Sequence, residues 1–202
     1  MTEFYVVRHG QTSWNVLCKC QGVTNIPLSE VGINQANILA DKIFNLGLNF
    51  DVYVSSNLDR AITTCNIIKN RLNNKSNIVI KKGVTERNFG QLEGKSFDFV
   101  GDAFAKNLQE TFPGFENNED LVKRTIECIK ELANQYPNKK ILVVSHSNTI
   151  KAMAYYVDKN KYNFGTKISN VNVSKFTYDT DLHLDDLYFI PGLGEDKTKI
   201  KE

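Results

Sequence analysis

Short apolar segments alternate with amphipathic segments along almost the whole chain of 202 residues, and this alternation restricts the fold more than any other feature. The apolar segments predict buried strands, because each is brief and bounded by polar or turn residues; they cover residues 3–7, 50–56, 77–82 and 139–146. The amphipathic segments repeat apolar residues at helical spacing; they cover residues 27–47, 58–72, 96–112, 118–137 and 148–157. This alternation predicts an α/β fold, a three-layer α/β/α sandwich with a mainly parallel central sheet.

The C-terminal part of the chain predicts an antiparallel hairpin at the edge of this sheet. Residues 171–179 and 186–192 alternate apolar and polar side chains, and the polar segment between them, which contains His183, predicts a solvated turn. An exposed edge strand can pair with a second copy of the chain, so the hairpin could form a homodimer. The length suits a single domain, for which we expect residues 1–193, followed by a solvated tail over residues 194–202.

Charge and composition argue against several classes of partner. The net charge is +2 and the lysines are scattered, which is not the basic surface of a nucleic-acid-binding protein. The N-terminus has no basic region followed by an apolar run, and no apolar stretch approaches the roughly 18 residues that a membrane span requires. The four cysteines lack the spacing of a zinc site, so we expect reduced thiols and a cytoplasmic location.

Scarce basic residues follow the predicted buried strands. The chain has five arginines and three histidines, and Arg8, His9, Arg60 and His146 each lie at or just past the end of a predicted strand. Ligands of parallel α/β sheets bind at the carboxyl ends of the strands, so these side chains are expected to meet. Arginine grips carboxylate or phosphate oxygens with paired hydrogen bonds, and histidine can act as a nucleophile, an acid or a base. Such a positive pocket suits a dianion, and phosphate fits.

Taken singly, each of these residues also has a plain structural explanation. A histidine after a strand can simply cap the next helix, and Arg60 could lie on a helix surface. A metal site at His9 and His146 is disfavoured, because the same motifs offer no carboxylate or thiolate ligand and the adjacent Arg8 repels a cation. The joint pattern, rather than any one residue, therefore carries the prediction.

Six segments of the chain resemble the successive motifs of a known family: VVRHGQTSWN, QGVTNIPLSEVG, SSNLDRAITT, ERNFGQLEGK, PGFENNEDLVKR and VVSHSNTIKA. In this order, from about residue 4 to residue 178, they are similar to the histidine phosphatase superfamily in its phosphoglycerate mutase-like branch. The R-H-G-x-T signature together with the late S-H motif is specific. The resemblance implies a histidine acid-type phosphatase, a phosphoric monoester hydrolase that needs no cofactor and no metal.

The resemblance also implies a role for each matching residue. His9 matches the nucleophile that becomes phosphorylated, and Glu86 matches the acid that protonates the leaving group. The phosphate oxygens would be held by Arg8, Arg60 and His146. Further substrate or phosphate contacts are implied for Asn15, Gln21, Gly22 and Ser147, the last of which stands where the family usually has glycine.

Elementary chemistry supports these roles. A neutral imidazole attacks phosphorus only when its lone pair is aimed correctly, and the carbonyl of Gly10 could fix the tautomer of His9. Two arginines and a protonated His146 would stabilise the charge on the equatorial phosphate oxygens. Glu86 would protonate the leaving oxygen and afterwards deprotonate the attacking water, a kind of catalysis that typically contributes about 10²–10⁴-fold. Glu93 is the next candidate if Glu86 is not the acid.

The acceptor of the phosphoryl group distinguishes a phosphatase from a mutase. Residues 87–115 predict a short, aromatic cap over the site whose cations are Arg87, Lys95 and Lys106; outside it, Lys19 could also steer an anion. Such a cap favours water as the acceptor and a substrate with an apolar or neutral body. We therefore predict a phosphatase that acts on a small-molecule phosphate ester. A 2,3-bisphosphoglycerate-dependent phosphoglycerate mutase, an isomerase, is the first alternative, and a non-catalytic phospholigand-binding protein is the second.

Overall fold

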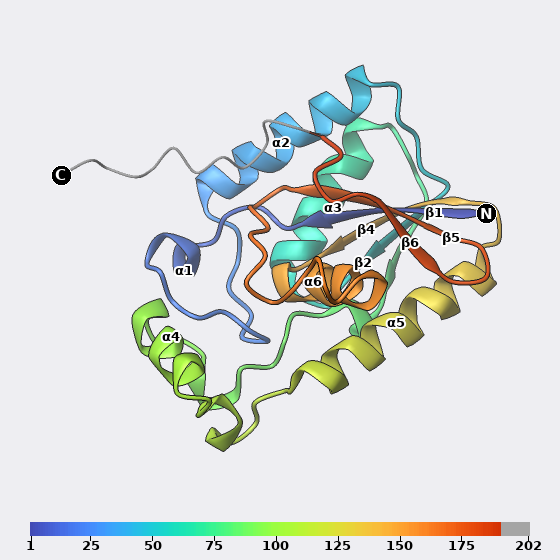
Figure 1. Ribbon diagram of the computed structural model, residues 1–202. Helices are drawn as coiled ribbons and strands as arrows, with labels where there is room; N and C mark the ends of the chain where they lie inside the picture. The colour runs from blue at the N-terminus through green and yellow to red at the C-terminus, as the bar shows by residue number, and fades with distance from the viewer. Residues whose placement is uncertain (191–202) are drawn as a thin grey trace.

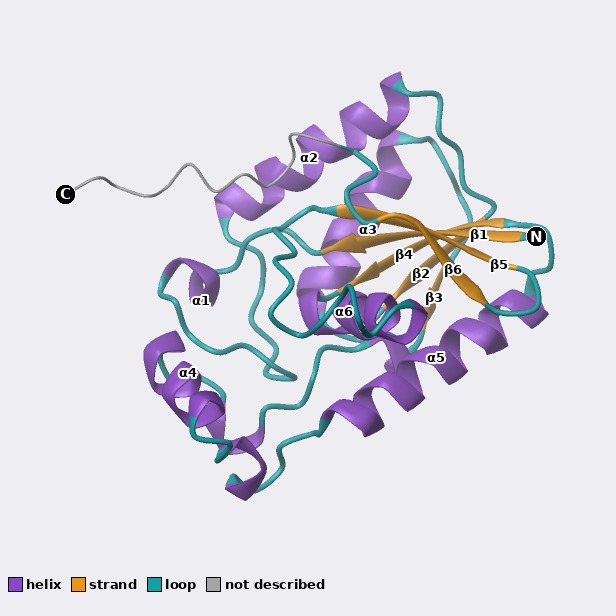
Figure 2. Ribbon diagram, viewed as in Figure 1, coloured by secondary structure: helices purple, strands orange, loops and turns teal. Residues whose placement is uncertain are grey.

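A six-stranded mixed sheet forms the centre of the computed structural model, which describes residues 1–190 (Figures 1 and 2). The strands are β1 Thr2–Arg8, β2 Val52–Ser55, β3 Ile78–Ile80, β4 Lys140–Ser145, β5 Val173–Tyr178 and β6 Leu182–Asp186. They lie in the order β3-β2-β4-β1-β5-β6, in which the first four are parallel and the last two pair antiparallel. This arrangement confirms the predicted α/β fold with a mainly parallel sheet and an antiparallel edge hairpin.

Most helices begin close to the positions that the sequence predicted. The helices are α1 Ser13–Val16, α2 Glu30–Asn45, α3 Asp59–Arg71, α4 Phe97–Ala105, α5 Asn118–Gln135 and α6 Ser147–Val157, with short 3₁₀ turns η1 Lys82–Val84, η2 Gly90–Leu92 and η3 Gln109–Thr111. Ser29 caps α2 by accepting a hydrogen bond from the backbone N–H of Gly32, and Asn117 caps α5 in the same way through Asp120. Helix α1 was not predicted, because its four residues are too few to show a period. Among residues 1–190, no helix combines the length and the apolar character of a membrane span.

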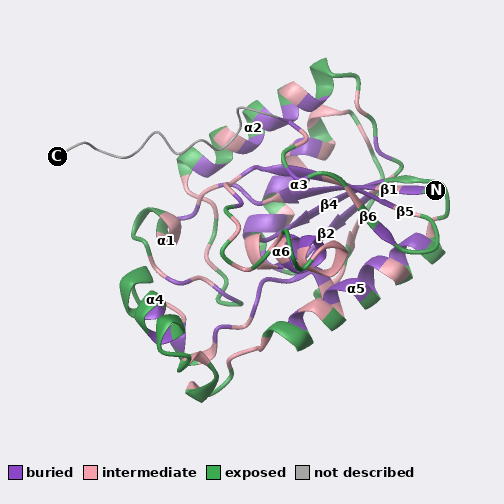
Figure 3. Ribbon diagram, viewed as in Figure 1, coloured by how far each residue is buried: buried purple, intermediate pink, exposed green. Residues whose placement is uncertain are grey.

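The central strands are largely buried between helices (Figure 3), and their alternate residues belong to cores on opposite faces of the sheet. On β1, Phe4 and Val6 belong to a core cluster that α5 and α6 cover, whereas Tyr5 and Val7 belong to a second cluster under α2 and α3. Successive side chains of a strand point to opposite faces, so a strand buried on both faces needs an unbroken apolar run. This requirement explains why the strand-like segments of the sequence are apolar rather than alternating.

The second strand of the edge hairpin lies earlier in the chain than predicted. β6 occupies the segment where we expected a solvated turn, and His183 is therefore an exposed residue of a strand. Residues 187–190 form turns, and the last two residues of the predicted strand 186–192 lie outside the described residues. The chain reverses just before β6 because the carboxylate of Asp179 accepts hydrogen bonds from the backbone N–H groups of the next two residues. Leu182 begins the strand and is buried. The residues that follow it can be polar because β6 is an edge strand.

A small separate core lies beside the carboxyl edge of the sheet, next to α1 and α4 (Figure 1). Its buried residues are Cys20, Phe89, Leu92 and Val100, against which Phe112 and Phe115 pack. The predicted helix over 96–112 is interrupted here, because Asn107 has φ of 53°, in the left-handed region that ends a helix. The predicted tail over 194–202 lies outside the described residues.

Candidate active site

The ends of neighbouring strands bring the predicted basic residues together. Arg8 at the end of β1 pairs in register with Ser145 at the end of β4, so His9 and His146 follow adjacent strand ends. Their ring centroids are 5.1 Å apart, and both side chains are buried. Arg60 lies in the first turn of α3, directly after β2, which is the other neighbour of β4. The expected convergence of two histidines and two arginines at one edge of the sheet is therefore observed.

The ring of His9 is held by the turn that follows β1. Its Nδ1 lies 2.6 Å from the carbonyl oxygen of Gly10, so Nδ1 carries the proton and donates it, as we expected. The N–H of Gly10 donates to Oγ1 of Thr64 at 3.2 Å, and the side-chain amide of Asn170 donates to the carbonyl of His9 at 3.0 Å. Because Nδ1 is the donor, Nε2 keeps the lone pair that a nucleophile requires.

His146 presents one ring nitrogen to the protein and leaves the other without a protein partner. Its Nε2 lies 2.7 Å from Oγ of Ser56, which follows β2. Its Nδ1 is buried and has no hydrogen-bond partner among the described residues. A buried polar atom without a partner is costly, so this nitrogen suits a ligand oxygen.

Both histidines are neutral in the ligand-free protein. Burial, followed by the charges of Arg60 and Arg8, holds the pKa of His9 well below its ordinary value. Burial also comes first for His146, whose pKa is likewise held well below the ordinary value, with Arg60 as the largest charge contribution. The protonated His146 that we expected around a bound phosphate stays a prediction, because the buried ring beside two guanidinium groups would need an anion to favour its charged form.

Arg60 is fully buried and its guanidinium is held from behind by a loop. Its Nη2 donates to the carbonyl of Gly22 at 2.6 Å, and its Nη1 donates to the carbonyl of Thr24 at 2.9 Å. In the amide orientation that suits both neighbours, the oxygen of Gln21 accepts from Nε and Nη1 of Arg60 at 2.9 and 3.0 Å, while its nitrogen donates to Thr12. Burial lowers the pKa of Arg60 to about 10, so it stays charged at neutral pH. Gln21 and Gly22 thus hold the Arg60 guanidinium through hydrogen bonds.

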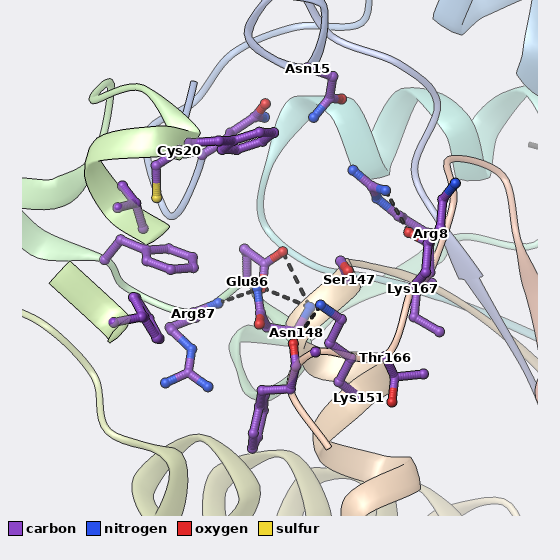
Figure 4. A pocket seen from close by; sticks show the side chains of 18 of the residues that line it. Arg8, Asn15, Cys20, Glu86, Arg87, Ser147, Asn148, Lys151, Thr166 and Lys167 are labelled. Carbon is purple, nitrogen blue, oxygen red and sulfur yellow. Dashed lines mark hydrogen bonds between the residues drawn. The ribbon is translucent and has the colours of Figure 1, made fainter. Parts of the chain in front are cut away.

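A cavity of about 700 Å³ opens beside these groups (Figure 4). The predicted site residues that line it are Arg8, Asn15, Gln21, Glu86 and Ser147. The remaining four, which are buried next to lining residues, are His9, Gly22, Arg60 and His146. Arg8 and Ser147, which line the cavity, are the chain neighbours of His9 and His146, so the two buried histidines lie directly behind the cavity wall.

Arg8, at the end of β1, and Asn15, in α1, are each hydrogen-bonded to other residues of the protein. Nη1 of Arg8 donates to the carbonyl of Ile168 at 2.6 Å. Oδ1 of Asn15 accepts from the N–H and the hydroxyl of Thr12 at 3.0 and 3.2 Å, which forms a capping box at the start of α1. Asn170, which sequence reasoning missed, lines the cavity and donates to the same Asn15 oxygen at 3.4 Å. No sequence motif marked Asn170, since it lies in a loop.

Glu86 is a buried carboxylate that faces the cavity (Figure 4). Its Oε1 accepts from the N–H of Arg87 at 2.8 Å and from the N–H of Asn148, in the first turn of α6, at 3.2 Å. It is the one carboxylate among the described residues that line the cavity. Glu93, the second candidate acid, is not among those lining residues, and its oxygens are occupied by backbone N–H groups.

An arginine of α5 holds the segment that carries Glu86. Nη1 of Arg124 donates to the carbonyls of Gly83 and Thr85 at 2.9 and 2.8 Å, and Nη2 donates to the carbonyl of Glu86 at 3.0 Å. Its Nε and Nη2 also bind the two carboxylate oxygens of Glu116 at 2.5 and 2.9 Å. All five N–H donors of this guanidinium are thereby used, which explains why an arginine rather than a lysine is needed there.

The cavity carries more positive charge than the cap and the predicted site residues supply. Lys19, Lys151 and Lys167 line it, and burial lowers the pKa of Lys151, whose Nζ donates to the carbonyl of Phe164 at 2.9 Å. Sequence reasoning missed Lys151 and Lys167, because neither belongs to the cap over residues 87–115. The helical position of Lys151, little more than one turn after His146, was an available signal. Arg87 also lines the cavity, but its guanidinium is bound to Glu116 and Asn118.

Among the residues that the structure describes, no group of three or more His, Cys, Asp or Glu side chains is arranged to hold a metal ion.

The charges around His9 determine what chemistry the site can perform. Two arginines and an orphaned histidine nitrogen surround a neutral imidazole with a free lone pair, and one carboxylate stands across the cavity. Such a set can bind a phosphoryl group, attack it and exchange a proton with the departing oxygen.

Comparison with known proteins gives a consistent result. Residues 4–184 match the family model described as "Histidine phosphatase superfamily (branch 1)". A protein of Bacillus subtilis strain 168 that is named "uncharacterized phosphatase PhoE" is 35% identical over 153 residues, which is 76% of each chain. The phosphoserine phosphatase of Entamoeba histolytica in complex with 3-phosphoglyceric acid is similar in structure, with a TM-score of 0.79 and 27% identity over 96% of this chain and 100% of that one. The phosphoglycerate mutase of Bacillus anthracis str. Sterne has a TM-score of 0.83 and 26% identity over 92% of both chains.

Proposed function

Because the chain belongs to the histidine phosphatase superfamily, branch 1, we propose that it is a metal-independent phosphomonoesterase that forms a phosphohistidine on His9. One observation carries this proposal: the ring of His9, neutral and oriented by Gly10, lies beside His146 and near the charges of Arg60 and Arg8, next to a cavity that Arg8 lines. Such a concentration of positive charge around a nucleophile needs a dianion as its ligand.

The reaction that we propose has two displacements at phosphorus. Nε2 of His9 attacks phosphorus, the phosphorus–oxygen bond of the ester breaks, and the departing oxygen takes a proton from Glu86. A water molecule then loses a proton to Glu86 and attacks the phosphohistidine, the phosphorus–nitrogen bond breaks, and inorganic phosphate leaves. Arg8, Arg60 and Nδ1 of His146 stabilise the equatorial oxygens throughout.

Asn15 and Ser147 complete the anion site in this proposal. The amide nitrogen of Asn15 lies on the cavity side of the capping box, and Ser147 opens α6, where backbone N–H groups favour an anion. Gln21 and Gly22, which we expected at the border of the substrate, are better explained as supports of Arg60.

The substrate that the cavity supports best is a small phosphate ester that carries a second anionic group. Lys19, Lys151 and Lys167 line the same cavity in addition to Arg8, and a substrate whose only charge is the phosphate would leave these lysines without an anionic partner. This differs from the neutral body that we expected from the cap alone. It agrees with the structural similarity to a phosphoserine phosphatase that binds 3-phosphoglyceric acid.

A 2,3-bisphosphoglycerate-dependent phosphoglycerate mutase is the second candidate. The same three lysines favour it, and so does the similarity to a phosphoglycerate mutase. The aromatic character of the cap favours the phosphatase, since a mutase must bind a second phosphate while it excludes water. A non-catalytic phospholigand-binding protein remains the third reading, and Glu86 argues against it because binding alone does not need an acid.

Three features of organisation also belong to this proposal. The predicted domain over residues 1–193, of which the structure describes residues 1–190, is one catalytic domain in which residues 87–115 act as the cap. The edge strand β6 pairs with a second copy to form a homodimer, which sedimentation velocity tests directly. The protein acts in the cytoplasm, a proposal supported by the absence of zinc-site or disulfide spacing among its cysteines, and cell fractionation tests it.

Trapping the covalent intermediate tests the proposal. Rapid quenching of turnover with ³²P-labelled phosphoserine should yield an acid-labile, base-stable adduct, and His9→Ala should abolish both adduct and activity. His183→Ala, which changes an exposed histidine on β6, is the matched control and should keep both. Full activity of His9→Ala would overturn the assignment of the nucleophile.

The choice of acceptor is tested with 3-phosphoglycerate. A phosphatase should release inorganic phosphate without any bisphosphate primer, and the rate should be the same with and without EDTA. Conversion to 2-phosphoglycerate only in the presence of 2,3-bisphosphoglycerate, with slow release of phosphate, would favour the mutase.

A further inference from the structure

The carboxylate of Glu93, just after η2, binds a loop from a distant part of the chain. Its Oε1 accepts from the backbone N–H of Val23 at 2.9 Å, and its Oε2 accepts from the backbone N–H of Thr24 at 2.8 Å. The hydroxyl of Thr24 also donates to Oε2, and the N–H of Phe89 donates to Oε1 at 3.2 Å. Both oxygens are thus saturated with donors, which requires an ionised carboxylate that accepts at each oxygen.

The same loop holds Arg60. The carbonyls of Gly22 and Thr24, on either side of the N–H groups that Glu93 binds, accept from Nη2 and Nη1 of Arg60. The peptide unit between Gly22 and Val23 therefore points its N–H at Glu93 and its carbonyl at the guanidinium, and Thr24 bonds to both groups through its own N–H and carbonyl. A carboxylate acceptor on one side of the Gly22–Val23 unit polarises it and strengthens its carbonyl contact on the other.

Gly22 permits this arrangement. A Cβ at this position would lie 2.1 Å from Oε1 of Glu93 and 2.8 Å from the carbonyl oxygen of Arg87, so any side chain would push the loop away. Arg8 is bound to a different loop, because its Nη1 donates to the carbonyl of Ile168 at 2.6 Å. The loop of residues 22–24 thus binds Arg60, and the loop that contains Ile168 binds Arg8.

We propose that Glu93 is a positioning residue that sets the direction of the Arg60 guanidinium through the loop of residues 22–24. The inference rests on the proposed function only in assigning Arg60 to the phosphate. Glu93 lies within the cap over residues 87–115, so the position of the cap affects the direction of the Arg60 guanidinium, which binds the phosphate in the proposed function. Glu93 therefore affects the binding of the phosphoryl group and has no part in protonating the leaving group.

Binding of inorganic phosphate, measured by isothermal titration calorimetry, tests the inference without requiring turnover. Glu93→Gln places an amide N–H against backbone N–H donors, and it should weaken phosphate binding about tenfold, as expected for the loss of hydrogen bonds to a charged group. Glu110→Gln, the same chemical change on an exposed residue of η3, is the matched control and should leave the affinity unchanged.

A double-mutant cycle supplies a readout that general loss of structure would not produce. Glu93→Gln should add little to the loss caused by Arg60→Lys, because both changes disturb the same contact. It should multiply the loss caused by Arg8→Lys, because that arginine is held elsewhere. The ratio of activities on alkyl and aryl phosphates should stay constant in Glu93→Gln, whereas a general acid would change it.

Unchanged phosphate affinity in a folded Glu93→Gln protein, or equal coupling to Arg60 and Arg8, would overturn the inference while leaving the proposed function intact. A changed ratio of alkyl to aryl activity would also overturn it and make Glu93 the acid. If Glu93→Gln does not fold, Thr24→Val removes one exposed hydroxyl donor to Glu93 and should weaken phosphate binding severalfold. Phosphate binding that follows the expected pattern without any turnover would instead overturn the proposed function and keep the inference.

Discussion

Protonation of the two buried histidines should destabilise the fold as the pH falls below about 6.5. In the folded, ligand-free protein, burial and the neighbouring arginines hold the pKa of His9 and of His146 well below the ordinary value, so both rings are neutral. In the unfolded chain the same rings take up protons near their ordinary pKa. The unfolded state therefore binds more protons in this range, and the free energy of unfolding falls as the pH falls.

The size of the effect follows from the number of rings. A ring that is neutral when folded and protonated when unfolded contributes about 1.4 kcal/mol per pH unit to the free energy of unfolding. The two rings together approach about 2.7 kcal/mol per unit below pH 6, against a typical total stability of about 5–15 kcal/mol. Two pH units should thus remove a large part of the stability of the ligand-free protein.

Urea unfolding followed by circular dichroism between pH 7 and pH 5 measures this slope. His146→Gln keeps a polar group near Ser56 but cannot take up a proton, so the slope should fall by about half. His183→Gln, at an exposed position of β6, is the control and should change the slope little. Equal slopes for wild type and His146→Gln would refute the reasoning, because they would show that the buried ring is already charged or that other groups dominate.

Three further outcomes are expected. Phosphate binding at pH 7 should take up protons, because the dianion favours a charged His146, and calorimetry in two buffers of different ionisation enthalpy should detect this; equal apparent enthalpies would contradict it. Arg124→Lys should lower turnover of alkyl phosphates about tenfold more than that of aryl phosphates, because Glu86 loses the guanidinium that holds its segment; equal losses would contradict it. Gly10→Ala should destabilise the fold by roughly 1–3 kcal/mol in urea unfolding, because its Cβ would lie 2.4 Å from the carbonyl oxygen of Gly32; an unchanged midpoint would contradict it.

The sequence predicted those parts of the fold and the site that depend on strands buried on both faces. Apolar runs located the four parallel strands, and the rule that ligands bind at their carboxyl ends selected His9, Arg60 and His146 before any geometry was available. The contact between His9 and the carbonyl of Gly10 was also predictable, because it joins neighbouring residues in a tight turn. In these cases the chemistry of neighbouring residues and the spacing of apolar residues along the chain were sufficient for the prediction.

Features that depend on packing between distant loops could not be predicted. Glu93 and Gly22 contact each other only because the cap folds back on an earlier loop, and no spacing in the sequence records that contact. The neutral state of His146 depends on its burial beside two arginines, which a motif does not reveal. The edge strand β6 was misplaced because its polar residues resemble a turn when the neighbouring strand is unknown.

The parallel pairing of β1 with β4 also determines when in folding the site can exist. Arg8 lies opposite Ser145, so contact between His9 and His146 closes a loop that contains both helices α2 and α3 as well as the cap. Closing a long loop is entropically costly, and pairings between distant segments form slowly. The site therefore cannot form before the chain from β1 to β4 has been brought together. In a chain that is still being synthesised, His9 can meet His146 only after β4 has left the ribosome. Until then the R-H-G segment at the N-terminus lacks the second histidine of the site.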